Sequence, residues 1–235
     1  MQQTMRLFKM GLRQMTKDGM IFAMLPAPFL LGFVIRFGLP YVNQLLEKTL
    51  SFSIVPWYSM ADAALVSLTP MFLGMVSAFI LLEERDEGTG LYYQITPVEG
   101  YSYLVARVGF PMIWGFLSSL AAVLLLGISQ TPFLDILIAA VISTILGTAI
   151  AMMVVSFADN KVEGLAISKL SGLIFIGLVA EWFAPAPYAY IGGIFPTYWL
   201  GDIMKNGAGI LAVSAGLVTG VLWIALFTRR FLRRI

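Results

Sequence analysis

Six apolar runs of membrane-spanning length follow one another along the chain, and they constrain its fold more than any other feature. The runs cover residues 19–42, 58–82, 103–127, 136–157, 165–182 and 208–227. A helix needs roughly 20 apolar residues to cross a hydrocarbon core of about 30 Å. In lipid the backbone must satisfy its own hydrogen bonds, which a helix does within a single run. The sequence therefore predicts an all-α integral membrane protein with six transmembrane helices.

The low charge content supports the same conclusion. Of the 235 residues, 59% are hydrophobic and 12% are charged, whereas a soluble domain carries about 25% charged residues because its surface faces water. The chain has neither His nor Cys, which excludes thiol nucleophiles, histidine bases, disulfides and the usual zinc or haem ligands. We therefore expect a lipid-embedded protein with no catalytic residue and no metal site.

The basic residues predict the orientation of the chain. An even number of spans places both termini on one side, which the positive-inside rule identifies as the cytoplasm. That face then collects Arg6, Lys9, Arg13, Lys17, Arg85, Arg107, Lys161, Arg229, Arg230, Arg233 and Arg234. The opposite face holds only Lys48 and Lys205, with Arg36 near the boundary. We expect a multi-pass protein of the cell membrane with both termini in the cytoplasm.

The segments outside the runs are predicted from their side-chain patterns. Residues 1–18 carry basic and apolar side chains on different sides of a helix, which predicts an interfacial amphipathic helix, with a frayed basic tail as the alternative. Residues 43–57 predict an interfacial loop, and residues 184–199 predict short outer-leaflet helices held by aromatic side chains. Pro26 and Pro28 lie inside the first run and predict a kink. We detect no internal repeat and no linker, so the whole chain forms one transmembrane domain.

The densest cluster of charge follows directly on the second run. It comprises Glu83, Glu84, Arg85, Asp86, Glu87, Gly88 and Thr89. These acids suit the first turn of a helix, where the positive end of the helix dipole lies, and Pro97 would end that helix. The segment therefore predicts a short helix across the cytoplasmic face, available to a partner in the cytosol. A solvated loop whose charges mark the membrane boundary is the alternative.

The order of residues here resembles that in the permease subunits of type-2 ATP-binding-cassette (ABC) exporters. In that family the second span ends in a Glu-x-Glu-x-Gly-Thr-like stretch, followed by an apolar helix, Thr-Pro and the third span. Residues 84–89 and 96–97 stand in that order and spacing, and residues 195–199 resemble the Pro-containing stretch before the last span. The chain departs from the pattern at Gly90, where Leu is usual. Within the class it is most similar to small drug-export permeases of the fluoroquinolone-export type.

The resemblance implies a transport subunit rather than an enzyme. Such a subunit has a cytoplasmic coupling helix between spans two and three, and it forms the translocation path as a homodimer or heterodimer of permeases. A separate cytosolic ATPase would bind the segment from Glu83 to Thr89 and would hold the ATP and Mg. In agreement with this, no Gly-x-x-x-x-Gly-Lys-Ser/Thr phosphate loop occurs in the chain. We expect no cofactor on this chain and no nucleic-acid partner.

Polar and small residues inside the runs predict further contacts. Arg36 and Asp62 fall at similar depth near the outer ends of adjacent antiparallel spans, which predicts either an ion pair or independent snorkelling to the interface. Gly216 and Gly220 form a Gly-x-x-x-Gly pair, and residues 143, 147 and 151 repeat this spacing of small side chains. Such spacing lets helices approach closely, either within the chain or between subunits.

The sequence leaves other classes of function open as alternatives. An ion-gradient-driven secondary transporter is the alternative to the ABC-type exporter, and it predicts carboxylates near the bilayer centre and related half-sequences. A membrane-embedded enzyme would need polar clusters inside the spans. A non-transporting scaffold or immunity protein with the same fold is a further alternative. The substrate is not specified by any residue.

Overall fold

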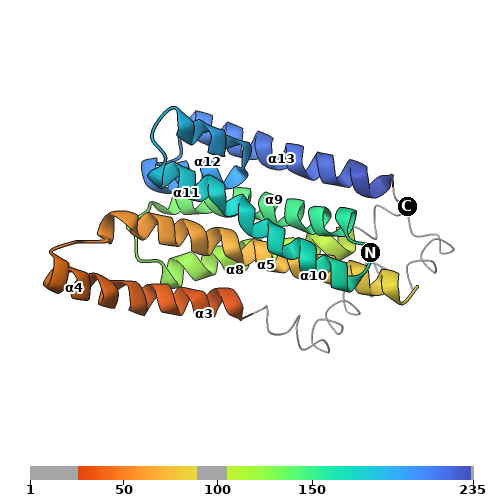
Figure 1. Cartoon of the computed structure of the whole chain (residues 1–235), viewed down its shortest axis with the longest axis horizontal. Helices are drawn as coiled ribbons and strands as arrows, with labels where there is room; N and C mark the ends of the chain where they lie inside the picture. The colour runs from red at the N-terminus through yellow and green to blue at the C-terminus, as the bar shows by residue number, and fades with distance from the viewer. Residues whose placement is uncertain (1–25, 89–104, 234–235) are drawn as a thin grey trace.

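The computed structural model describes residues 26–88 and 105–233, and in these ranges the regular structure is entirely helical. The elements are α3 (Ala27–Phe33), η1 (Val34–Gly38), α4 (Leu39–Leu50), η2 (Val55–Trp57), α5 (Tyr58–Asp86), η3 (Val105–Gly109), α8 (Phe110–Leu126), α9 (Phe133–Phe157), α10 (Lys161–Leu170), η4 (Ser171–Phe175), α11 (Ile176–Phe183), η5 (Tyr188–Ile194), α12 (Pro196–Asn206) and α13 (Ile210–Leu232). They form an elongated bundle (Figure 1).

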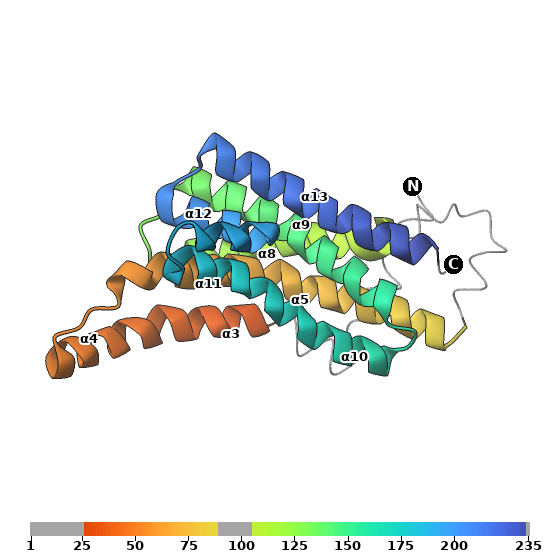
Figure 2. The same ribbon diagram turned by 45° about the horizontal axis from the view of Figure 1, so that its top comes forward.

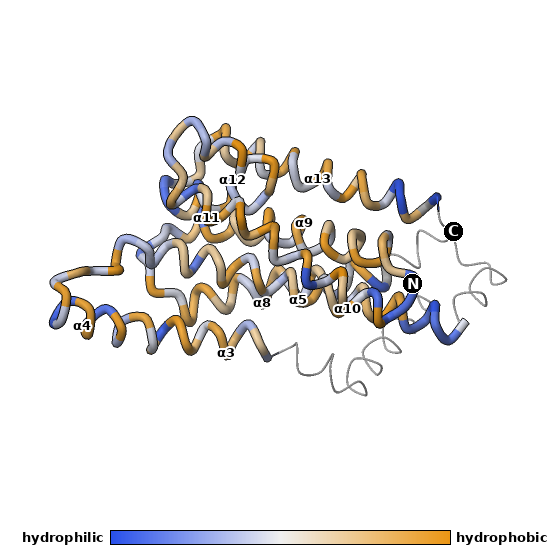
Figure 3. The backbone as a smooth tube through the Cα atoms, viewed as in Figure 1, coloured by the Kyte–Doolittle hydropathy of each residue, from blue (hydrophilic) through white to orange (hydrophobic). Residues whose placement is uncertain are grey.

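Six helical stretches of the described chain are long and apolar enough to cross a membrane. They are Ala27–Leu50, Val55–Asp86, Arg107–Leu126, Phe133–Phe157, Lys161–Phe183 and Ile210–Phe231. Hydrophilic residues gather towards the two ends of the bundle, and the middle is mostly hydrophobic (Figure 3). The predicted all-α architecture with six spanning helices is therefore confirmed. The predicted interfacial helix over residues 1–18 and the coupling helix beyond Gly88 lie outside the described residues.

The centre of the bundle is the crossing of α5 and α9, which make the most extensive contact between any two elements. In the stretch that contains α5, 89% of the most apolar segment is buried, and in α9 72% is buried. Two glycines bring the backbones together: a Cβ on Gly74 would lie 3.3 Å from the Cα of Gly147 and closer still to its carbonyl oxygen. A Cβ on Gly147 would meet Pro70 in the same way. The core is therefore built on direct backbone packing.

The small residues of the last span also pack inside the chain. A Cβ on Gly216 would lie 2.9 Å from a methyl carbon of Ile142, and one on Gly220 would lie 2.6 Å from a methyl carbon of Ile145. Both isoleucines belong to α9, so the Gly-x-x-x-Gly pair seats α13 on the central helix pair. Of the two contacts that the sequence left open, the structure thus shows the internal one.

The first span is described only from Pro26 onward, which is the N-cap residue of α3, and Pro28 lies in the first turn. The kink predicted at these prolines stays a prediction, because the residues before Pro26 lie outside the described ranges. Within the described part the helix deviates at the π-helical segment η1, two residues before Pro40. Because Pro40 has no N–H to donate to the carbonyl four residues back, the local hydrogen-bond pattern shifts there. The same arrangement occurs at η3, which precedes Pro111.

The two π-helical segments have similar sequences, a short repeat that was not recognised from the sequence alone. Residues 34–40 read Val-Ile-Arg-Phe-Gly-Leu-Pro, and residues 105–111 read Val-Ala-Arg-Val-Gly-Phe-Pro. Both carry an arginine at the centre of the π-helical segment. The repeat thus places Arg36 and Arg107 at equivalent points of two different spans.

The predicted interfacial loop over residues 43–57 is largely helical. The helix α4 continues to Leu50 and ends at Ser51, whose φ of 52° is left-handed. Asn43 fixes the return of the chain, because its Oδ1 accepts hydrogen bonds from the Ile54 N–H at 2.8 Å and from the Ser53 hydroxyl at 3.2 Å. The first span therefore runs eight residues further than its apolar run, from 42 to 50.

The fifth span is divided into three pieces. The α-helices α10 and α11 are joined by the 3₁₀ segment η4, and all three lie along one side of α5 (Figure 2). Between α11 and α13 the chain forms η5 and α12, two short helices at the end of the bundle opposite the C-terminus (Figure 1). Short helices were predicted in this region.

Candidate functional site

The acidic segment forms the last turns of α5 rather than a separate element. Glu84 is 2% exposed and Glu83 and Arg85 are half-buried, whereas Asp86 and Glu87 are exposed. Gly88 follows with a φ of 67°, a left-handed conformation that glycine adopts without strain. Thr89, the last residue of the predicted site, lies outside the described residues. The segment thus presents some of its charges to solvent and turns others inward.

The most buried of these charges forms an ion pair with the third span. Arg107 binds Glu84 in a bidentate ion pair: the Nε of Arg107 donates to Glu84 Oε2 at 3.2 Å, and its Nη2 donates to Oε1. Each side chain is 3% exposed. A buried carboxylate or guanidinium is strongly unfavourable without a counter-ion, and here each group supplies one to the other. The pair fixes the end of α5 against η3, at the start of the third span.

Two further carboxylates hold the start of the fifth span. The Oδ2 of Asp86 accepts a hydrogen bond from the Lys161 backbone N–H at 3.0 Å. The Lys161 ammonium lies 3.3 Å from Glu83 Oε2. Because Lys161 is the first residue of α10, Asp86 places a negative charge at the positive end of that helix dipole. Asn160 completes this N-terminus by accepting from the Glu163 N–H at 2.9 Å.

Arg85 connects α5 to the fourth and sixth spans. Its Nη1 donates to the carbonyl of Ala158, directly after α9, at 3.0 Å. Its guanidinium carbon lies 5.8 Å from the centre of the Phe231 ring in α13. Nearby, the guanidinium carbon of Arg230 lies 4.2 Å from the ring centre of Phe157. Cations over aromatic faces attract electrostatically, so these contacts hold the ends of α9 and α13 together.

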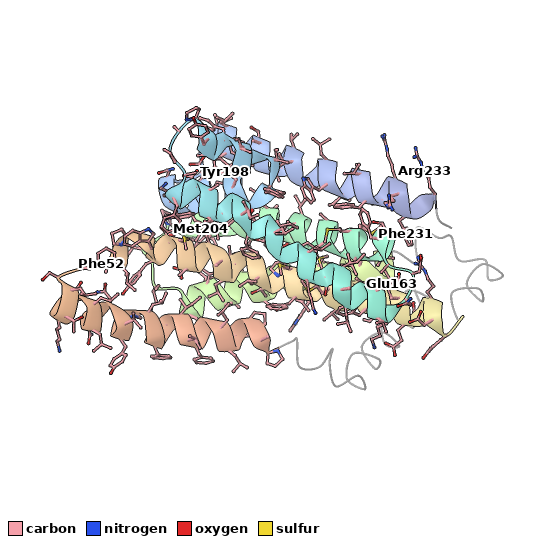
Figure 4. All side chains as sticks on the ribbon, viewed as in Figure 1. Phe52, Glu163, Tyr198, Met204, Phe231 and Arg233 are labelled. Carbon is pink, nitrogen blue, oxygen red and sulfur yellow. The ribbon has the colours of Figure 1, made fainter. Side chains whose placement is uncertain are left out.

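We call Glu83, Glu84, Arg85, Asp86, Arg107 and Lys161 the charged network. It joins the end of α5 to the third, fourth, fifth and sixth spans at one end of the bundle, where Glu163 and Phe231 lie in Figure 4. Within the predicted segment, Asp86 and Glu87 are the exposed acids. A contact between this segment, Glu84 included, and an ATPase stays a prediction.

The sequence analysis missed the pairing of Glu84 with Arg107. It assigned Arg107 to the cytoplasmic surface, because the residue lies close to the start of a predicted span. A signal was present: Glu84 and Arg107 have opposite charges and lie within a turn or two of the facing ends of consecutive antiparallel runs. A second signal was the Gly-x-Pro sequence of residues 109–111, which directly follows Arg107 and Val108 and accompanies the π-helical segment η3.

Arg36 and Asp62 meet at the opposite end of the bundle, through the turn that follows α8. The Nη1 of Arg36 donates to the Gly127 carbonyl at 2.8 Å. Asp62 is 1% exposed and accepts from the N–H groups of Ile128, at 3.0 Å, and Ser129, at 2.7 Å. Among the described residues the two side chains form no direct ion pair, and both hold the same turn. Asp62 is buried and anchors this turn.

A third pair lies beside that turn. The Lys205 ammonium binds the backbone carbonyl of Glu181 at 2.7 Å and its carboxylate at 3.1 Å. Tyr198 packs nearby, and its burial, followed by the charge of Glu181, raises the pKa of its hydroxyl above the usual range. The tyrosine is therefore neutral at physiological pH. These contacts hold α12 against α11.

Comparison with known proteins identifies relatives of the whole bundle. A family described as fluoroquinolones export permease protein Rv2686c-like matches residues 11–228. The chain is similar to two proteins named fluoroquinolones export permease proteins MT2760 and Rv2686c, from two strains of Mycobacterium tuberculosis. Each is 23% identical over 186 residues, covering 78% of this chain and 74% of the relative. No solved structure gives a significant match. With nearly the full bundle matched, the chain belongs to the fluoroquinolones export permease Rv2686c-like family.

Proposed function

We propose that this chain is the transmembrane subunit of an ABC-type export complex in the cell membrane. Two permease copies, identical or different, form the translocation path. A separate cytosolic ATPase binds ATP and Mg and drives the cycle. Both termini and the charged network face the cytoplasm. Fluoroquinolones are the first substrates to test, because the names of the two relatives describe them as fluoroquinolone export permeases.

The observation that carries this proposal is the charged network at the end of α5. A permease without its own ATP site needs a mechanical connection between its cytosolic surface and its spans. The network supplies one, because Glu84, Arg85 and Asp86 bond to the third span, the end of the fourth and the start of the fifth. A displacement at the exposed acids Asp86 and Glu87 would therefore reach several spans together.

The proposal is tested by co-purification of this chain with a candidate cytosolic ABC ATPase. Glu87→Lys reverses the charge of an exposed acid whose side chain forms no hydrogen bond or ion pair with the residues that the structure describes. Charged contacts at an interface contribute of the order of 2 kcal/mol or more, so we expect the reversal to weaken ATPase binding about 10-fold or more. Glu84→Lys is avoided, because it would place two cations in a buried site.

The matched control is Lys48→Glu, which reverses an exposed charge on α4 at the other end of the bundle. It should retain the ATPase as the wild type does. If the wild-type chain purifies without any ATPase, the ABC-type proposal is wrong and a gradient-driven carrier becomes the leading function. If the complex forms but no fluoroquinolone is exported into vesicles that contain it, the substrate alone must be reconsidered.

A further inference from the structure

A pocket of about 370 Å³ lies at the end of the bundle opposite the charged network. Three parts of the chain line it: Ser59 at the start of α5, the α8–α9 connection with Asp135 in the first turn of α9, and the last turn of α12. Met204, one of the lining residues, is labelled in Figure 4 far from Phe231. Pockets of about 300–1,000 Å³ hold small organic molecules. The volume therefore suits a ligand much larger than an ion.

One wall of the pocket carries a buried carboxylate with an uncommitted oxygen. Asp135 is 8% exposed. Its Oδ1 accepts the Ala208 N–H at 3.0 Å, whereas its Oδ2 has no hydrogen-bond or ion-pair partner among the described residues. The Oδ2 of Asp135 would lie 3.8 Å from a Cβ placed on Gly207, and Gly207 also lines the pocket. A carboxylate oxygen that borders a pocket is available to accept a hydrogen bond from a donor bound there.

The cations nearby do not neutralise this carboxylate. Lys205 lines the pocket, but its ammonium binds the carboxylate and the carbonyl of Glu181. Arg36 is directed to the Gly127 carbonyl. Asp62 holds Ser129 by its N–H and by its hydroxyl, at 2.5 Å, and Arg36 lies at the same turn, so these two charges compensate each other away from Asp135. The pocket therefore has an excess of negative charge and favours a cation.

The chemistry of the lining distinguishes between kinds of cation. The described residues contain no group of three or more His, Cys, Asp or Glu placed to hold a metal ion, and hard divalent cations require six or more oxygen ligands. Ile203, Met204 and Pro132 supply apolar surface beside the carboxylate. Ser129 and Thr131, whose hydroxyls lie 2.8 Å apart, supply a polar wall. Apolar and polar walls around one carboxylate match an organic molecule with a protonated amine.

We propose that this pocket binds a small organic ammonium ion. The ammonium N–H donates to Oδ2 of Asp135, and the apolar part of the ligand packs against Ile203 and Met204. Asp62 does not touch the ligand, and it positions the wall formed by Ser129. The site requires only the fold of this chain, so it is independent of the proposed ABC partner and of any transport cycle.

The test is equilibrium binding of dansylcadaverine to the purified chain in lipid nanodiscs. This probe joins an environment-sensitive fluorophore to a primary ammonium, and dansylamide is its counterpart without the ammonium. We expect saturable binding of dansylcadaverine with a blue-shifted emission and much weaker binding of dansylamide. Asp135→Asn retains an oxygen for the Ala208 N–H and removes the charge. Because a hydrogen bond to a charged group is lost, affinity should fall about 10- to 100-fold.

Two further variants make the result specific. Glu47→Gln removes an exposed acid at the same end of the molecule and outside the pocket, so it should leave affinity unchanged. Ser59→Phe fills the pocket from the start of α5 without removing a charge, and it should abolish saturable binding. The proposal is overturned if the wild type shows no saturable binding, if Asp135→Asn binds like the wild type, or if dansylamide binds as tightly as dansylcadaverine.

Discussion

Glu83 and Glu84 are neighbours on α5 and occupy very different surroundings. The Glu84 side chain is 3% exposed and lies against Arg107, whereas that of Glu83 is 28% exposed and lies 3.3 Å from the Lys161 ammonium. A half-buried pair such as that of Glu83 gains little, because water still solvates both charges. A buried pair is different, since removal of one partner leaves the other charge without water or a counter-ion. The two pairs should therefore respond very differently to the same substitution.

At this scale we predict that Glu84→Gln destabilises the protein by about 3–5 kcal/mol, because Arg107 stays charged and buried. Glu83→Gln is the matched control, and it should cost under about 1 kcal/mol. Unfolding by a denaturing detergent, followed by circular dichroism, gives both values. The double variant Glu84→Gln with Arg107→Gln should recover part of the loss. Equal costs for the two single variants would contradict the burial of this pair.

Pairings of this kind were the hardest feature to predict from the sequence. The acidic segment was recognised from local composition, which needs no knowledge of neighbours. The partner of each charge depends on the rotation of one helix against another, which hydropathy does not encode. Arg107 was therefore assigned to the surface. Asp135 was passed over because it lies one residue before the predicted start of a span, where an acid is ordinary.

At the scale of elements, the crossing of α5 and α9 depends on the absence of side chains. Gly74 and Gly147 have no side chains where the two backbones meet, and Pro70 lies at the same crossing. Without a hydrophobic driving force between helices in lipid, such close packing supplies much of the association energy. The spacing of small residues in the fourth span could be recognised from the sequence, but its partner helix could not.

We predict that Gly147→Ala destabilises the protein by about 1–3 kcal/mol, because the added methyl group forces α5 and α9 apart. Gly172→Ala is the control, since a Cβ at that position meets nothing within 4 Å. It should be neutral or slightly stabilising, because alanine restricts the unfolded chain. Both are measured by the same detergent titration. A neutral Gly147→Ala would show that the two helices separate more easily than the crossing implies.

At the scale of the whole molecule, the fold class and the number of spans followed from the sequence, because spanning length and apolar content are properties of each run alone. The ends of the spans were less accurate. The first span continues to Leu50, since the helix α4 includes the exposed charged residues Glu47 and Lys48 beyond the apolar run. The fifth span begins at Lys161 because Asp86 and Asn160 cap that helix. These boundaries are set by hydrogen bonds that composition does not reveal.

The orientation predicted from the basic residues is tested by thiol labelling, because the chain contains no cysteine. Glu87→Cys and Glu47→Cys place single thiols at exposed positions at opposite ends of the bundle. In intact cells a membrane-impermeant maleimide should label Glu47→Cys and should leave Glu87→Cys unlabelled until the membrane is permeabilised. The cysteine-free wild type gives the background. The opposite pattern would invert the proposed topology.

The ion pair between Glu84 and Arg107 joins the two ends of the connection between the second and third spans. One end of this connection continues into α5 and the other into η3 and α8. Because this pair fixes the end of α5 against η3, we expect the second and third spans to move as one rigid pair rather than to slide past each other. In the proposed complex, an ATPase acting at this point would tilt both helices together.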